Sequence, residues 1–398
     1  MAGRSGAGYL RPVTDAVALF NTNFLPYSQT FVYEEIRHHV RYAVEVFCRR
    51  RLLADRFPFE PVHVGGPLYA LACRSVAFDA RFRTVPFRLV HAHFGLGAVY
   101  ARPFAARHDL PLVVTFHGYD VPLLSSPTRW LPEHLRYAIL GPRVLHEMTL
   151  GLCASHELRE MLLELGVPAD RLRVHHLGID LERFAPGTRP NNECRVVMIG
   201  RFVEKKGFGY GLRAFAEVAR DEPMLSLVIV GDGPEGSRLR KLADELGIAG
   251  RVTFTGPMPP DQVATLLGTS HVLLAPSVVD RQGNRESGLI VAKEASACET
   301  VPIGTHHGGI PDIIDDGVTG FLVPERDVGA IADRLRRLAR DPALRERLGA
   351  AAREKMRREY DNRVRVAALE DLYDEARERY RGSAGATREA AGSAAGKK

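Results

Sequence analysis

Short apolar segments alternate with helical segments along most of this chain, and no other feature constrains its fold as strongly. In the first half we expect strands at residues 16–20, 43–48, 89–93, 112–116, 150–154 and 173–177, a helix at 30–39 and a helix capped by Ser155. The pattern restarts with strands at 195–199, 225–230, 252–254, 272–274 and 300–303 and a helix at 210–220. This alternation predicts α/β structure with parallel, doubly wound sheets and binding loops at the carboxyl ends of the strands.

The length of the chain and its composition predict two domains. A chain of 398 residues is too long for one ordinary core. We expect a first domain at residues 1–185, a linker at 186–193, a second domain at 194–360 and a final helix at 361–381. The tail at 382–398 is rich in Gly, Ala and Ser, and this composition predicts disorder.

Several classes of protein are excluded by composition. The chain has no apolar run long enough to cross a membrane, and its first residues lack the apolar core of a signal peptide. Its five cysteines are scattered, which predicts buried thiols in the cytoplasm and no zinc cluster. The net charge of +6 is not accompanied by a basic stretch interleaved with aromatic residues, so nucleic acid is not an expected partner.

The basic segment at residues 37–56 has two readings. It could lie on an anionic membrane that carries a lipid-linked acceptor, at the inner face of that membrane. A solvated helix face followed by a strand is the reading we favour.

Two carboxylates eight positions apart, Glu286 and Glu294, flank a predicted helix start near Gly288. The first turn of a helix offers unpaired backbone N–H groups and the positive end of a dipole, both suited to phosphate. A diphosphate held there would lie between two groups able to bind hydroxyls. Two solvated glutamates beside an ordinary helix would give the same pattern, so the pair alone does not decide.

Four motifs in order make the pattern specific: residues 200–207 with Arg201 and Lys206, residues 230–234 with Gly231, the Glu286–Glu294 segment, and residues 307–312 with Gly308 and Gly309. This sequence resembles the retaining glycosyltransferases of family 4, which have the GT-B fold. Residues 25–31 resemble the version of the N-terminal loop found in exopolysaccharide-type members. The resemblance implies two Rossmann-like domains facing a cleft and a last helix that crosses back to the first domain.

The resemblance also implies roles for residues in the second domain. Arg201 and Lys206 would clamp the diphosphate of a nucleotide-sugar, Glu294 would accept hydrogen bonds from the ribose, and Glu286 would contact the donor sugar. Lysine is rare in this arginine-rich chain, so Lys206 stands out, while Lys205 matches the motif less well. The remaining donor-binding residues that we expect are Gly200, Gly231, Ser287, Gly288, Leu289, Gly308 and Gly309.

In the first domain, the resemblance implies that His117 faces the donor sugar. Ser28, Gln29 and Thr30 stand where many relatives have a glycine-rich loop, so acceptor contacts there would come from side chains. Asp120 could contact the acceptor or could cap a helix.

A metal is not expected. His91 and His93 alternate on one strand, but no third ligand is evident, and we expect His175 and His176 to be structural. The resembled fold needs no metal or other cofactor.

These observations predict a retaining glycosyltransferase that moves a sugar from a UDP- or GDP-sugar to an acceptor hydroxyl. Expected pathways are polysaccharide, glycolipid or glycosylated-metabolite biosynthesis. The alternatives are a nucleotide-sugar epimerase of the same fold and a non-catalytic nucleotide-sugar binding protein. A dehydrogenase is disfavoured because neither half shows a strand followed by the dinucleotide-binding glycine motif.

Overall fold

A computed structural model describes residues 15–26, 29–190 and 193–395 of the chain. Contacts between Cα atoms divide the chain into two compact units. Unit 1 contains Met1–Thr115, Ile139–Gly151 and Val366–Lys398, and unit 2 contains Phe116–Ala138 and Leu152–Arg365. The residues of each sheet are nevertheless continuous in sequence: strands of the first sheet come from residues 15–174 and strands of the second from 194–323.

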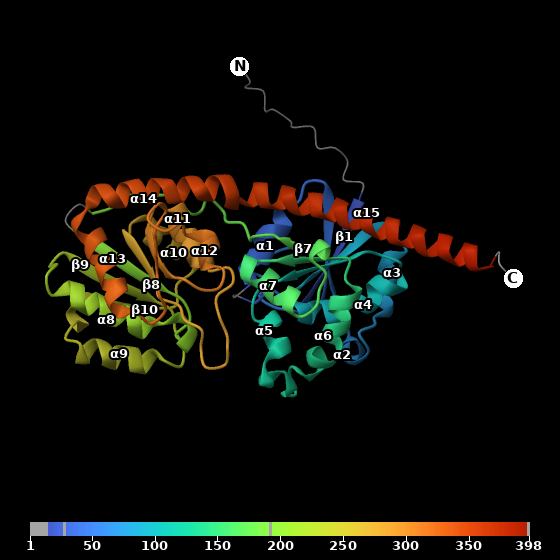
Figure 1. The fold of residues 1–398 in the computed structure, drawn as a ribbon, viewed down its shortest axis with the longest axis horizontal. Coiled ribbons are helices and arrows are strands. Elements are labelled where there is room, and N and C mark those ends of the chain that lie inside the picture. The colour runs from blue at the N-terminus through green and yellow to red at the C-terminus, as the bar shows by residue number, and fades with distance from the viewer. Residues whose placement is uncertain (1–14, 27–28, 191–192, 396–398) are drawn as a thin grey trace, which may run out of the picture. The chain divides into compact units, whose positions relative to one another are not determined.

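The first sheet has seven strands in the order β3-β2-β1-β4-β5-β6-β7. Its strands are β1 (Asp15–Phe24), β2 (Tyr42–Arg51), β3 (Val62–Val64), β4 (Phe87–His93), β5 (Leu112–Phe116), β6 (Leu150–Cys153) and β7 (Leu172–Val174). The helices of this stretch are α1 (Thr30–Arg37), α2 (Pro67–Ala72), α3 (Val76–Phe82), α4 (Phe94–Arg107), α5 (Asp120–Ser125), α6 (Leu135–Glu147) and α7 (His156–Glu164), with short 3-10 turns at Pro127–Trp130 and Ala169–Arg171 (Figure 1).

The second sheet has six strands in the order β10-β9-β8-β11-β12-β13, all paired in parallel. Its strands are β8 (Cys194–Ile199), β9 (Leu225–Val230), β10 (Val252–Gly256), β11 (Val272–Ala275), β12 (Val301–Thr305) and β13 (Phe321–Val323). The helices are α8 (Phe208–Ala219), α9 (Gly236–Glu245), α10 (Pro260–Gly268), α11 (Ile290–Ala297), α12 (Ile310–Ile313), α13 (Val328–Arg340) and α14 (Pro342–Lys355), with 3-10 turns at Glu204–Lys206 and Ala249–Arg251 and a π-turn at Met356–Tyr360.

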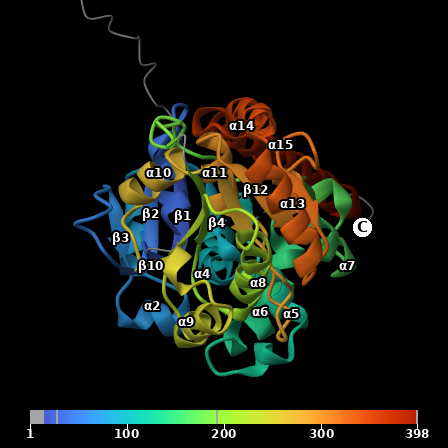
Figure 2. The ribbon, with the colours of Figure 1, turned by 90° about the vertical axis from the view of Figure 1, so that its left-hand side faces the viewer.

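Helices cover both faces of the second sheet, as expected for a doubly wound fold. On one face α8 and α13 lie side by side (Figure 2), and their Leu212, Phe215 and Leu335 are buried against the strands. On the other face, Ala292 of α11 and Met356 pack in a second apolar cluster with Leu273 of β11. The predicted parallel α/β architecture is therefore confirmed.

The strand order fixes where ligands can approach the second sheet. Strand order reverses between β8 and its neighbour β11, whose Val196↔Val272 pairing brings their carboxyl ends together. Open α/β sheets bind ligands in the crevice beyond this switch point. The loops that follow β8 and β11 carry the motifs at residues 200–207 and 286–294.

Some predicted elements need correction. Residues 21–24, expected in a loop, continue β1, because this strand pairs with the long β2 as far as Phe24↔Arg51. Residues 42–51 of the basic segment form β2 inside the sheet, which confirms the strand of the favoured reading. Membrane contact of the segment at 37–56 stays a prediction. The Ser155 cap is confirmed.

The last helix, α15, spans Asn362–Ala395. The sequence predicts that it ends at 381 and that a disordered tail follows, but the helix continues through an alanine-containing segment, and alanine is the strongest helix former. Residues of α15 from Val366 onward belong to unit 1. No helix among the described residues is both long enough and apolar enough to cross a membrane.

Glu370 fastens α15 to the segment before β2 within unit 1. Its carboxylate accepts hydrogen bonds from the backbone N–H groups of Val40 and Arg41 at 2.9 and 2.8 Å and pairs with His39 at 3.3 Å. Burial alone would raise the pKa of Glu370, but His39 and the two N–H groups outweigh it and lower the pKa to about 2 from the ordinary 4.5. The ionised carboxylate is thus held by several donors at once.

Replacing Glu370 with Gln should lower the free energy of unfolding by about 2–3 kcal/mol at pH 7, because hydrogen bonds to a charged group are lost. Since the folded pKa lies below the unfolded one, the contribution is complete above pH 4.5 and disappears as the pH falls towards 2. Urea unfolding of both proteins at several pH values measures this difference. Asp371→Asn is the control, because that side chain is 75% exposed and should cost less than about 1 kcal/mol.

Candidate active site

Three loops of unit 2 meet at the carboxyl ends of neighbouring strands. The loop after β8 carries Lys206, the loop after β11 carries Glu286, and the loop after β12 carries Gly308. Because β8, β11 and β12 are adjacent in the sheet, the loops that carry Lys206, Glu286 and Gly308 come together although these residues are far apart in sequence. The motifs singled out in the sequence therefore belong to one place.

Glu286 is the buried residue at the centre of these three loops. Its side chain is 9% exposed, and its Oε2 lies 3.1 Å from the Nζ of Lys206 while its Oε1 lies 3.4 Å from the Nζ of Lys205. Burial alone would raise the pKa of Glu286, but the two ammonium groups, Lys206 first, hold it below its usual value. The carboxylate is ionised, and both positive charges face it.

The loop that carries Glu286 is fixed to the loop after β12. The backbone N–H of Gly309 donates to the carbonyl of Glu286 at 2.9 Å. Gly308 has φ of +61°, and a Cβ there would come within 1.8 Å of that same carbonyl oxygen. A Cβ on Gly309 would meet the carbonyl of Ser287 at the same distance, so only glycine allows this approach.

Helix α11 begins at Ile290, two residues later than the start predicted near Gly288, with Leu289 as its N-cap. Ser287 and Gly288 therefore lie in the loop that leads into the helix. The Oγ of Ser287 is buried and accepts no hydrogen bond from the described residues. Burial raises the pKa of the half-buried Glu294, further along α11, to about 7, and Arg183 opposes this shift.

Three other predicted donor-binding residues, Gly200, Arg201 and Gly231, do not contact Glu286 as Lys206 does. Gly200 directly follows β8, and the side chain of Lys206 lies over it, 3.3 Å from the position of a Cβ. Arg201 is exposed and makes no side-chain hydrogen bond or ion pair within the described part of the chain. Gly231 follows β9 and donates its N–H to Gly256 at 3.0 Å. Arg201 is thus a cation that the protein itself leaves available.

His117 follows β5, as predicted, and is half-buried. The next residue, Gly118, comes against the Glu286 loop, since a Cβ there would lie 2.2 Å from the Oγ of Ser287. Asp120 is buried and accepts the backbone N–H groups of His117 and Gly118 at 3.3 and 3.0 Å. The carboxylate of Asp120 therefore closes the turn before α5 (Asp120–Ser125), whose N-cap is Tyr119, so the expected role as a helix cap is wrong. A contact of Asp120 with the acceptor stays a prediction.

The predicted acceptor residues lie before and at the start of α1. Gln29 precedes the helix and accepts a hydrogen bond from the side-chain amide of Asn21 at 3.0 Å, and Thr30 is its first residue. Ser28 lies outside the described residues.

Sequence reasoning set Lys205 aside, but its ammonium is as much a part of the Glu286 environment as that of Lys206. It also missed Glu35, whose carboxylate lies 3.2 Å from His93. The available signal was an acid on the apolar face of α1, between Val32 and Ile36.

Glu35, His91 and His93 have ligand atoms within 4.8 Å of one another, which supplies the third group that the sequence did not reveal. Both ring nitrogens of His91 are already engaged, with Tyr373 and Thr115 at 2.7 Å each. A metal would have to displace one of these hydrogen bonds. This arrangement is that of a packed polar cluster.

A second such group consists of His156, His176 and Asp312. Here Asp312 accepts both the backbone N–H and the ring Nδ1 of His156 at 3.0 Å, and the Nδ1 of His176 lies 3.1 Å from the carbonyl of Ala154. The side chains are used to hold the start of α7.

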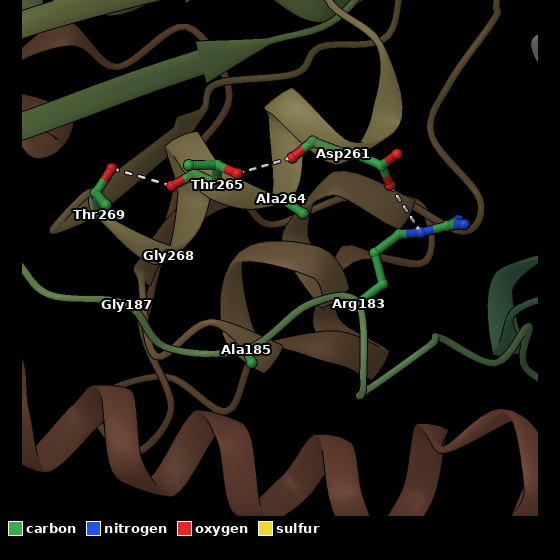
Figure 3. Close-up of a pocket in the computed structure, with 8 residues that line it drawn as sticks. All are labelled: Arg183, Ala185, Gly187, Asp261, Ala264, Thr265, Gly268 and Thr269. Carbon is green, nitrogen blue, oxygen red and sulfur yellow. Dashed lines mark hydrogen bonds and ion pairs between the residues drawn. The ribbon is translucent and has the colours of Figure 1, made fainter.

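A surface hollow of about 550 Å³ lies elsewhere in unit 2, between α10 and the segment at residues 183–187 (Figure 3). It is lined by Arg183, Ala185, Gly187, Asp261, Ala264, Thr265, Gly268 and Thr269. None of the predicted site residues lines this hollow. Arg183 and Asp261 form an ion pair in it at 3.3 Å, and the side chain of Asp261 is 87% exposed. The cluster of charged side chains around Glu286 is therefore the better candidate site.

Comparison with known proteins shows the family to which the chain belongs. Residues 181–355 match the family described as glycosyl transferases group 1, and residues 28–183 match glycosyltransferase family 4. The chain is 32% identical over 339 residues to D-inositol 3-phosphate glycosyltransferase of Acidothermus cellulolyticus, covering 77% of this chain and 72% of that protein. It is 28% identical to the putative colanic acid biosynthesis glycosyltransferase WcaL of Escherichia coli, covering 70% and 69%.

Among solved structures, Anabaena HepE in complex with UDP-glucose has the same fold, with a TM-score of 0.71 at 17% identity, and covers 91% of this chain and 99% of its own. Sucrose-phosphate synthase of Thermosynechococcus elongatus superposes with a TM-score of 0.72 at 23% identity, covering 91% and 98%. The family models, the curated relatives and the two doubly wound sheets agree, and the chain belongs to glycosyltransferase family 4.

Proposed function

We propose that this glycosyltransferase moves a sugar from a nucleotide-diphospho-sugar, a UDP- or GDP-sugar, to an acceptor hydroxyl with retention of the anomeric configuration. The observation that carries the proposal is the pair of lysines facing the buried carboxylate of Glu286 at the β8–β11 switch point. UDP-glucose in the HepE structure supports this class of donor. Relatives named for inositol phosphate and colanic acid glycosylation support a role in glycolipid, metabolite or polysaccharide biosynthesis.

Each donor group has a counterpart in unit 2. Arg201 and Lys206 neutralise the diphosphate as negative charge builds on it, since preorganised cations act most strongly on charge that develops in the transition state. The carboxylate of Glu294 accepts the ribose hydroxyls. Glu286 accepts hydroxyls of the sugar, and the backbone N–H groups of Ser287 to Leu289 lie beside it.

The acceptor hydroxyl attacks the anomeric carbon on the face from which the diphosphate leaves. The bond from that carbon to the diphosphate oxygen breaks, the new glycosidic bond forms, and the departing diphosphate takes the proton of the acceptor. His117 supports the sugar during this step, and the loop at Gln29 and Thr30 receives the acceptor. No carboxylate is assigned as a covalent nucleophile, no metal is required, and the proposed location is the cytoplasm.

A thermal-shift series with UDP-, GDP-, ADP- and TDP-sugars identifies the donor, because a ligand that binds the native state raises the melting temperature. The donor should then release its nucleoside diphosphate only when an acceptor is supplied. Release of an isomerised free sugar without acceptor would instead indicate an epimerase. Binding with no turnover across a broad acceptor series would indicate a binding protein.

Replacing Lys206 with Ala should lower kcat by about a hundredfold to a thousandfold, because one preorganised donor to the leaving group is removed. Nucleoside diphosphate binding should weaken much less than turnover. Lys241→Ala is the matched control, since that lysine is 79% exposed and its only ion pair among the described residues is with Glu245 on the same helix. Near-normal turnover of the Lys206 variant rules out its assigned role.

Activity should be unchanged in excess EDTA, because Arg201 and Lys206 supply the positive charge that a metal supplies in other transferases. The measurement is initial rate before and after dialysis against chelator. Complete loss that manganese or magnesium restores would contradict the roles given to both cations.

Nucleotide affinity should fall below neutral pH. Burial places the pKa of Glu294 at about 7, so its carboxylate is ionised above that pH and protonated below it. If the ribose hydroxyls donate to the ionised form, affinity for UDP should drop by up to about tenfold between pH 8 and pH 6. Calorimetric titration of Glu294→Gln over the same range isolates this effect from titration of the nucleotide itself, and an unaltered pH dependence in that variant would refute it.

A further inference from the structure

The carboxylate of Glu286 is shared between two ammonium groups that come from one 3-10 turn, Glu204–Lys206. The two oxygens are used differently. Oε2 is close to Lys206 at 3.1 Å, whereas Oε1 is 3.4 Å from Lys205 and accepts no hydrogen bond from the described residues. Oε1 is therefore paired with the charge of Lys205 and can still accept hydrogen bonds.

In the proposed function, Lys206 interacts with two anions, the carboxylate of Glu286 and the diphosphate of the donor. A bound diphosphate carries more charge than one carboxylate and would draw the Nζ of Lys206 towards it. Glu286, with its side chain only 9% exposed, would then lose its nearer partner. A buried carboxylate without a counter-ion is strongly destabilised and takes up a proton.

Lys205 is held to the segment that carries Glu286. Its Nζ donates to the carbonyl of Arg285 at 3.4 Å, and its own carbonyl accepts the N–H of Val278 at 2.8 Å. Its ammonium is also more exposed than that of Lys206, at 31% against 18% of the side chain. These contacts tie Lys205 to the loop after β11, whichever way Lys206 turns.

We propose that Lys205 is a positioning residue, which keeps Glu286 ionised and aimed at the hydroxyls of the donor sugar while Lys206 turns to the diphosphate. The two adjacent lysines thus have separate roles: Lys205 remains paired with the carboxylate of Glu286, and Lys206 binds the leaving diphosphate. This inference rests on the proposed function and adds a residue to it.

The other charged groups near Glu286 cannot replace Lys205. His307 lies beside it, with its Nε2 3.5 Å from the backbone N–H of Glu286, but burial lowers the pKa of His307 and favours its neutral form. Arg285 turns its guanidinium to Glu157 at 2.6 Å. Glu325 and Glu157, which face His307, are acids.

The test is the titration of Glu286, followed by carbon NMR of protein with labelled glutamate carboxyl groups. The resonance is assigned by its loss in Glu286→Gln. With saturating UDP, the pKa of Glu286 in Lys205→Gln should rise by about one to three units above wild type. Lys205→Arg should restore the low value, and without UDP Lys205→Gln should show a smaller rise, because Lys206 still faces the carboxylate.

Kinetics supply the second readout, with UDP-glucose as donor and UDP as inhibitor. Lys205→Gln should lose kcat and shift the acid limb of its pH profile upward, while inhibition by UDP stays within about twofold of wild type, because Lys205 acts on the sugar side. Unshifted titration and pH profile in a folded Lys205→Gln would overturn the role of Lys205 alone. Failure of wild type to bind UDP or to turn over UDP-glucose and every other nucleotide-sugar of the series would overturn the proposed function with it.

Discussion

The site depends on one buried ion-pair cluster, a carboxylate at Glu286 facing the ammonium groups of Lys205 and Lys206. Removing a charge from water is costly, and only close partners of opposite charge make its burial tolerable. The cluster can form because β8 and β11 are neighbours, so that the loops after them meet at their carboxyl ends. Strand order in the sheet therefore determines which charges face each other, and the charges determine what the crevice can bind.

Both sheets repeat the same core order, yet they use their switch points differently. Beyond β8, β11 and β12, the second sheet holds cations and loops in which glycines, such as Gly308 after β12, allow two backbone segments to approach closely. In the first sheet, β1 and β4 are the corresponding neighbours, and buried polar side chains fill the region beside them: His93 with Glu35, and His91 between Thr115 and Tyr373. One topology thus supports a charged crevice in one sheet and a packed polar core in the other.

The sequence predicted the features that local pattern controls. Alternating apolar segments located the strands to within a few residues, except the three-residue strands β3 and β13, which are too short to show a pattern and were not predicted. A side-chain oxygen followed by a helical pattern located the cap at Ser155. The nearness of Lys206 to Glu286 followed from parallel topology combined with a motif. Resemblance to a known family, rather than periodicity, assigned chemistry to these residues, and the roles of individual residues stay predictions.

What the sequence did not reveal was decided by packing between distant segments. Lys205 and Lys206 are adjacent and chemically identical, and only the fold shows that both face Glu286. Glu35 and His93 are far apart in the chain, and a pairing between them has no local signal. The start of α11 at Ile290 depends on how the loop before it is fixed to Gly309, which propensity alone does not describe.

A crystal structure with the nucleotide-sugar that most raises the melting temperature tests the central claim most directly. The account predicts that the diphosphate lies beyond the ends of β8 and β11, within hydrogen-bond distance of the Nζ of Lys206, with the ribose on Glu294 and the sugar hydroxyls on Glu286. A nucleotide bound beyond β1 and β4 instead, or one that leaves Lys206 paired with Glu286 and out of reach of the phosphates, would contradict it.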